Sequence, residues 1–161
     1  MPNDANDQLF EDWGRAFNVD AQLGKTVYHM ESTGGRNTGR SLKDDPDSPV
    51  GPMQMRPSTA AMIAKQNGIE GPIDLQDMRF AVPLAMAYLS QGVQHLKSAE
   101  GALGFYYSGN LDPTAWGPKT MAYVRNGQAL YPKMGLKLPA PAESTPPAQT
   151  ADTTPQDQPN G

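Results

Sequence analysis

Apolar residues recur at helical spacing over most of the chain, and this pattern limits the fold more than any other feature of the sequence. One face of a period of about 3.6 residues carries Leu9, Phe10, Trp13, Ala16 and Phe17. The same spacing returns at 21–30, 99–107 and 118–130. No run of about four to eight residues alternates convincingly between apolar and polar side chains, as a half-buried strand would. The sequence therefore predicts a mainly α fold.

Two further helices are indicated by residues that can cap them. Ser58 is the expected N-cap of a helix that stops at Gly68, and Asp77 is the expected N-cap of a longer helix that reaches Leu96. Pro83 would occupy or distort the opening turn of the longer helix. No stretch repeats at a fixed period, so a solenoid is not indicated. We expect a compact helical domain around a cleft.

Residues 139–161 differ in composition from the rest of the chain. The stretch PAPAESTPPAQTADTTPQDQPNG contains six prolines and no large apolar residue that could contribute to a core. A chain of 161 residues suits one folded domain. We therefore predict one folded domain at 1–138 and a disordered or surface-wrapping tail at 139–161.

The charge balance bears on the kind of partner. Three of the 17 acidic residues lie in the tail, so 14 acidic residues stand against 13 basic ones elsewhere. A nearly neutral body lacks the clustered Lys and Arg that bind phosphates, which argues against nucleic acid and is compatible with a neutral polysaccharide.

No apolar run approaches the roughly 20 residues that cross a bilayer, so we expect no membrane insertion. The first seven residues do not resemble a secretory signal.

The residue types present restrict the chemistry. The chain has no cysteine, which excludes thiolate nucleophiles and thiolate metal sites, and its two histidines are too few for a histidine-rich metal site. We expect no metal and no cofactor. Glu31 stands where a helix meets a long polar loop at 33–50, and long loops on rigid frames often build functional sites. Taken alone, a single glutamate at a helix end is most often a solvated surface residue.

Three ordered segments carry a family resemblance. They are Glu31-Ser32 at a helix end, GPMQMRPSTA at 51–60, and ALGFYYSG at 102–109 with Tyr123-Val124 after it. In order and approximate spacing they resemble the soluble lytic transglycosylase family, whose fold is lysozyme-like. The resemblance spans about residues 20–130. Pro52 replaces the usual Leu, Tyr107 replaces the usual Asn, and the segment between Glu31 and Gln54 is several residues longer than is common.

The resemblance implies a muralytic enzyme that cleaves peptidoglycan glycan strands. Glu31 would act first as general acid and then as base, while the muramic acid's own hydroxyl attacks and gives a 1,6-anhydro product. A cleft lined by apolar and aromatic side chains would desolvate Glu31 and raise its pKa. The expected substrate-binding residues are Ser32, Met53, Gln54, Met55, Tyr106, Tyr107 and Tyr123.

Each of these assignments has a structural alternative. Ser32 can bond local backbone groups, and Gln54 can be a structural amide that stabilises the long loop. Tyr106 is expected to bond toward Glu31 or to stack on a sugar, whereas Tyr107 and Tyr123 are as compatible with core packing.

Other functions remain open at this stage. The insertion carries Asp44, Asp45 and Asp47, any of which could hold a water for an inverting hydrolase. An endopeptidase of peptide cross-links and a non-catalytic wall-binding virion protein are further alternatives. For the setting we predict a phage lysin or virion-associated enzyme that acts in the periplasm or cell wall.

Overall fold

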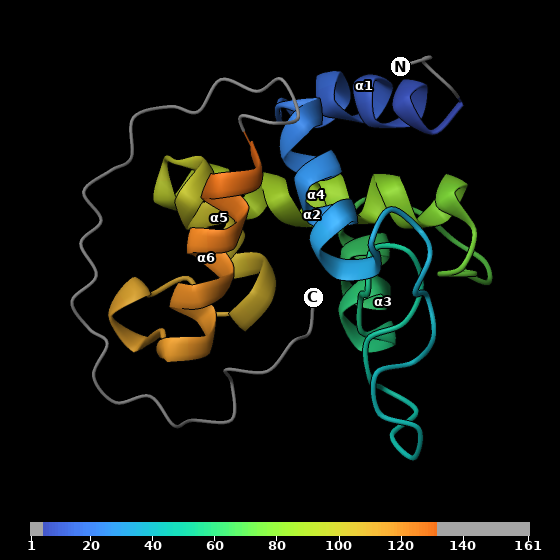
Figure 1. Cartoon of the computed structure of the whole chain (residues 1–161). Coiled ribbons are helices and arrows are strands. Elements are labelled where there is room, and N and C mark those ends of the chain that lie inside the picture. Colours follow the sequence, from blue (N-terminus) through green and yellow to red (C-terminus); the bar gives the residue numbers. More distant parts are fainter. Residues whose placement is uncertain (1–4, 132–161) are drawn as a thin grey trace.

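The computed structural model describes residues 5–131, and this part of the chain is helical (Figure 1). Its elements are α1 (Ala5–Phe17), α2 (Ala21–Ser32), α3 (Pro57–Gln66), α4 (Met78–Leu96), α5 (Ala99–Ser108), the short 3-10 helix η1 (Pro113–Ala115) and α6 (Pro118–Leu130). Between residues 5 and 131 the β pairing amounts to an isolated bridge, Val50 with Met55. The predicted mainly α fold is confirmed. The predicted tail at 139–161 and the domain end at 138 lie outside the described residues.

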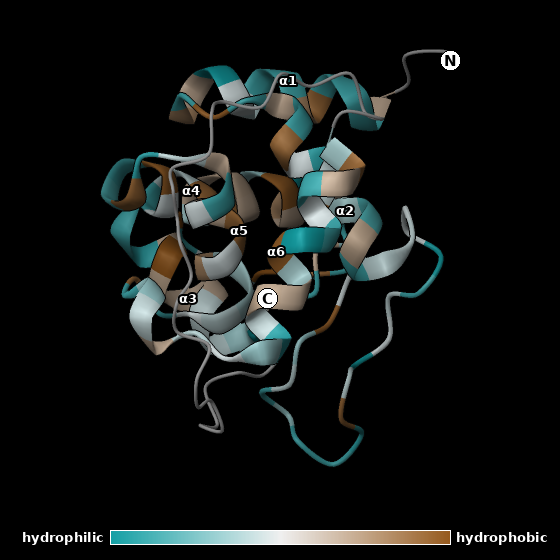
Figure 2. Cartoon of the chain, turned by 60° about the vertical axis from the view of Figure 1, so that its left-hand side comes forward, coloured by the Kyte–Doolittle hydropathy of each residue, from teal (hydrophilic) through white to brown (hydrophobic). Residues whose placement is uncertain are grey.

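Helix α4 is the centre of the core. Its residues from Ala81 to Ser90 are all buried, which is the pattern of a helix covered on every side. Helices α1, α3 and α5 pack against it, and α6 packs against both α5 and α2 (Figures 1 and 2). Within the described part of the chain, no helix is long and apolar enough to span a membrane.

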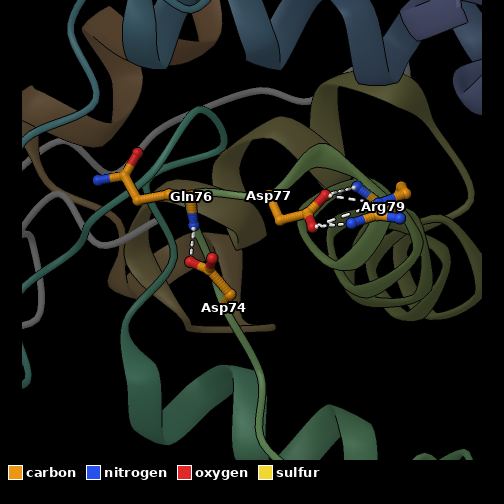
Figure 3. Close-up of polar contacts among 4 residues, drawn as sticks. All are labelled: Asp74, Gln76, Asp77 and Arg79. Carbon is orange, nitrogen blue, oxygen red and sulfur yellow. Dashed lines mark hydrogen bonds and ion pairs between the residues drawn. The ribbon is translucent and has the colours of Figure 1, made fainter.

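The start of α4 follows the sequence prediction closely. The Asp77 side chain accepts a hydrogen bond from the backbone N–H of Arg79 at 2.9 Å, and an ion pair of 2.7 Å joins it to the Arg79 guanidinium (Figure 3). These bonds from Arg79 lower the pKa of the Asp77 carboxyl. Asp77 is therefore the N-cap that was expected. Pro83 lies in the second turn rather than the opening one, so the helix continues past a residue that has no N–H.

The predicted cap of α3 is wrong. The helix begins at Pro57, and Arg56 occupies the N-cap position without a side-chain bond. Ser58 lies inside the first turn, where its N–H and hydroxyl both bond the Asp47 carboxylate, at 2.7 and 2.6 Å. Proline is well suited to the first helical position, which moves the helix start ahead of Ser58. The capping oxygen comes from the preceding loop instead.

Candidate active site

Helix α2 places Glu31 in its last turn. Asp20 caps the helix by accepting from the N–H of Gln22, and Leu23 and Val27 bury its inner face in the core. The helix ends because Thr33 adopts the left-handed conformation, with φ of 56°. Glu31 is thus held on a rigid helix, immediately before the chain enters the long loop.

The environment of Glu31 favours its neutral form. The residue is half-buried, so its side chain keeps access to solvent, but the surrounding protein desolvates the carboxyl. Burial raises the pKa of Glu31 and a hydrogen bond from Tyr123 offsets part of the rise, so that the pKa is about 8 instead of 4.5. The phenol of Tyr123 donates to Oε2 of Glu31 at 2.7 Å. At neutral pH the carboxyl is therefore mostly protonated and able to donate a proton.

Tyr107 of α5 and Tyr123 of α6 form an aromatic pair beside this carboxyl. Their ring centroids are 4.6 Å apart at an interplanar angle of 32°, and both residues are half-buried. Burial raises the pKa of Tyr123 well above its usual range, and the nearby Glu31 carboxyl raises it further. Tyr123 therefore stays a hydrogen-bond donor at neutral pH. Tyr123 is also one of the partly buried residues that pack against the core, so for this residue core packing and a place beside Glu31 occur together.

Tyr106, Met53 and Met55 belong to the buried core. Their exposed fractions are 0%, 1% and 0%, and the Tyr106 phenol donates to the backbone oxygen of Met53 at 2.7 Å. Side chains this deeply buried cannot stack on a sugar, so the expectation of direct side-chain contact does not hold for these three residues. They fix the 51–55 turn on α5, because the bond from Tyr106 joins two segments that are 53 residues apart.

The side chain of Gln54 is fully engaged within the protein. Its amide N–H groups donate to the backbone oxygens of Gly39 and Gly51, both at 3.0 Å, and its Oε1 accepts from the Ser41 hydroxyl at 2.9 Å. Only 8% of the residue is exposed. The structural alternative, an amide that stabilises the long loop, describes this geometry better than a sugar contact does.

Ser32 likewise bonds local backbone. It is fully buried, its hydroxyl donates to the backbone oxygen of Tyr28 at 3.1 Å, and it accepts from the N–H of Gly35 at 2.8 Å. These bonds stabilise the turn that follows Glu31, in the manner usual for a serine at a helix end.

The aspartates of the insertion take up different positions. Asp47 bonds Ser58, as described above, and Asp45 accepts from the N–H of Asp47 at 2.9 Å. Asp44 is exposed. The loop that carries them projects away from the helices before it returns to α3 (Figures 1 and 2). Among residues 5–131 there is no cluster of three or more His, Cys, Asp or Glu that could hold a metal ion.

Sequence reasoning missed two of these contacts. The bond between Tyr123 and Glu31 joins residues 92 positions apart, and the one between Asp47 and Ser58 joins residues 11 apart. Only the late Tyr-Val motif indicated that Tyr123 belongs to the site at all. An Asp in a loop ahead of a Pro-Ser helix start is the one local signal for the second contact.

The comparison with protein families agrees with the helical fold. The model of the transglycosylase SLT domain matches residues 8–126, which run from α1 into α6 and include Glu31, Tyr107 and Tyr123. The comparison with curated proteins gives no match. Domains of this family have the lysozyme-like helical fold and cleave the peptidoglycan of bacterial cell walls. With most of its length matched, the chain belongs to the transglycosylase SLT domain family.

Proposed function

We propose that this protein is a lytic transglycosylase that cleaves the bond between N-acetylmuramic acid and N-acetylglucosamine, with Glu31 as its sole catalytic carboxylate. The observation that carries the proposal is the half-buried Glu31 carboxyl, whose pKa of about 8 leaves it protonated at neutral pH. Glycosidic cleavage requires such a group to protonate the leaving oxygen.

In the first step Glu31 acts as the acid. Its Oε2 accepts the hydrogen bond from Tyr123, so Oε1 is the oxygen free to hold the proton and deliver it. The bond between C1 of the muramic acid and the leaving oxygen breaks as the proton moves. The Glu31 carboxylate that results is stabilised by the Tyr123 phenol, which offsets part of the cost of a charge in this desolvated position.

In the second step Glu31 acts as the base. The 6-hydroxyl of the same muramic acid attacks C1, and its proton passes to the carboxylate. The new bond between C1 and O6 forms the 1,6-anhydro ring, and Glu31 regains the proton with which it began. No water and no second carboxylate enter this sequence.

The hydrogen bonds of Asp45 and Asp47 favour this mechanism over an inverting hydrolase that would use either of them. Asp47 is occupied by two short bonds to Ser58, and Asp45 accepts from the backbone of its own loop. An inverting hydrolase would need a second carboxylate, about 6.5–9.5 Å from the acid, that is free to activate a water between them. The virion-associated setting, the action in the periplasm or cell wall, and an attachment to a virion or wall-associated assembly through the tail stay predictions.

The masses of the products test the proposal. Purified peptidoglycan is digested with the protein, and the released fragments are identified by mass spectrometry. We expect fragments that end in 1,6-anhydro-muramic acid and are lighter by one water than hydrolysis products. Reducing muramic acid ends would contradict the transglycosylase and favour the hydrolase, and free peptide termini with intact glycan would favour the endopeptidase. Binding without any release of fragments would favour the non-catalytic alternative.

A further inference from the structure

We propose that Tyr107 is a positioning residue that holds the phenol of Tyr123 against the Glu31 carboxyl. The inference rests on the proposed function, since it concerns the group that we assign as the acid. It starts from the departure at position 107, where the motif that the segment resembles has Asn and this chain has Tyr. A change from a small amide to a large ring alters what can pack beside Glu31.

Tyr107 contacts Tyr123, and Tyr123 in turn contacts Glu31. The Tyr107 ring lies 4.6 Å from the Tyr123 ring, centroid to centroid, and the Tyr123 phenol reaches Oε2 of Glu31 at 2.7 Å. Tyr107 comes from the last turn of α5, Tyr123 from α6 and Glu31 from the last turn of α2. Each residue therefore stands on a separate helix, and the ring of Tyr107 supports one face of Tyr123.

An unsupported Tyr123 ring would leave its hydrogen bond less populated. A tyrosine side chain that is only half-buried can rotate away from its partner unless packing restricts its ring. The tilted aromatic contact with Tyr107 supplies that restriction. An Asn at position 107 has no ring with which to make it, so the contact distinguishes this chain from the motif that it resembles.

The remaining groups around Glu31 do not replace this contact. Besides Tyr123, the titratable neighbour from α5 is Tyr106, which is held by Met53 and has Tyr88 of α4 against its ring, with centroids 5.4 Å apart. Burial and the Glu31 carboxyl raise the pKa of Tyr106 well above its usual range, so Tyr106 stays neutral. On α2 itself, His29 is exposed and Tyr28 is half-buried. The Tyr123 bond is thus the interaction that lowers the pKa of Glu31, and Tyr107 acts through it.

A direct titration of Glu31 tests the inference without any assay of activity. The protein is labelled with carbon-13 at the glutamate carboxyls, of which the chain has five, and the Glu31 signal is assigned with Glu31→Gln. The titration is repeated for Tyr107→Leu, Tyr107→Phe and Tyr123→Phe. We expect the pKa of Glu31 to rise most in Tyr123→Phe, to rise by a smaller amount in Tyr107→Leu, and to stay at the wild-type value in Tyr107→Phe, which keeps the ring.

The control removes an aromatic pair elsewhere. Phe17 is also half-buried and stacks on Trp13, with centroids 5.8 Å apart, on α1. Phe17→Leu is expected to leave the pKa of Glu31 unchanged. If Tyr107→Leu fails to fold, as judged by circular dichroism, Tyr107→Asn restores the residue type of the motif and gives the same comparison.

An unchanged Glu31 pKa in Tyr107→Leu or Tyr107→Asn would overturn the inference, and so would a rise of equal size in Phe17→Leu.

The alkaline limb of the pH–rate profile provides a second readout. It should move upward in Tyr107→Leu with a roughly two- to tenfold loss in kcat, the range expected for one aromatic contact. A rise in KM with the limb unmoved would instead assign Tyr107 to sugar binding alone. Failure of the proposed function would appear separately, as wild-type protein that releases no glycan fragments.

Discussion

At the scale of single residues, most polar side chains of the site form hydrogen bonds within the protein. Glu31 differs from the others, because its Oε2 is bonded to Tyr123 while its side chain keeps access to solvent. Gln54 and Ser32, by contrast, have their hydrogen bonds satisfied by nearby loop and helix groups. A residue in a family-like motif can therefore serve the reaction by holding the backbone that surrounds the acid.

Asp47 provides a residue-scale prediction. Asp47→Ala removes the acceptor for both the N–H and the hydroxyl of Ser58, so the free energy of unfolding should fall by about 1 kcal/mol, as for other lost helix caps. Most of the activity should remain, because Asp47 has no catalytic role in the proposed mechanism. Denaturant unfolding and fragment release measure the two effects. Asp44→Ala, at an exposed position of the same loop, is the control and should change neither.

A loss of activity without a loss of stability in Asp47→Ala would favour the inverting hydrolase. A general base contributes on the order of 10²–10⁴ to the rate, so a loss of that size in Asp47→Ala, with stability unchanged, would contradict the structural role.

At the scale of helices, local sequence signals predicted most of the boundaries. The expected helix at 118–130 is found as Pro118–Leu130, and Asp77 begins α4 as its side chain predicted. The start of α3 could not be predicted in this way, since its capping carboxylate comes from a loop residue that precedes it by ten positions in the chain. A cap that is supplied by a distant residue cannot be predicted from the residues at the helix start.

The contact between α5 and η1 supports a prediction about packing. The Trp116 indole lies directly on Gly104, and a Cβ atom there would stand 2.2 Å from the ring. The indole N–H is also fixed by the backbone oxygen of Asn110 at 2.9 Å, so the ring cannot move away freely. Gly104→Ala should therefore destabilise the protein by about 1–3 kcal/mol, despite the better helix propensity of alanine.

Thermal unfolding followed by circular dichroism measures this effect. The matched control is Gly39→Ala in the long loop, where nothing lies within 4 Å of the added methyl group and where the Tm should change little. A Gly104→Ala variant as stable as the wild type would show that the indole relocates at no cost.

At the scale of the whole molecule, the fold and the general chemistry could be predicted, while the arrangement of the site could not. Helical periodicity and three short motifs were enough for a mainly α, lysozyme-like domain. They did not reveal which motif residues face outward, since Tyr106 and Tyr107 are adjacent yet only the second is exposed to any extent. That difference depends on how α5 packs between α4 and α6.

The buried acid should affect the stability of the entire domain. A carboxyl whose pKa is about 8 when folded and 4.5 when unfolded holds its proton more tightly in the folded state between these values. Stability from this group is therefore fully present below about pH 4.5, is lost as pH rises toward 8, and changes no further above it. Glu31→Gln does not titrate and escapes this loss.

The prediction is a difference in Tm that grows with pH. Near pH 4 the wild type and Glu31→Gln should unfold at similar temperatures, and at pH 8 the variant should be more stable by on the order of 2–4 kcal/mol. Scanning calorimetry across this range measures the difference. A gap between the two proteins that stays constant with pH would mean that the carboxyl is not desolvated in the fold.

The most direct test of the central claim is the activity of Glu31→Gln on purified peptidoglycan at neutral pH. The substitution nearly preserves the shape of the side chain and can still accept from Tyr123, but it removes the proton that Glu31 transfers. We predict that the release of anhydro-muropeptides falls by at least about 100-fold, the lower end of what general acid–base catalysis contributes, while the protein stays folded. Release at the wild-type rate by a folded Glu31→Gln protein would contradict the assignment of Glu31 as the catalytic acid.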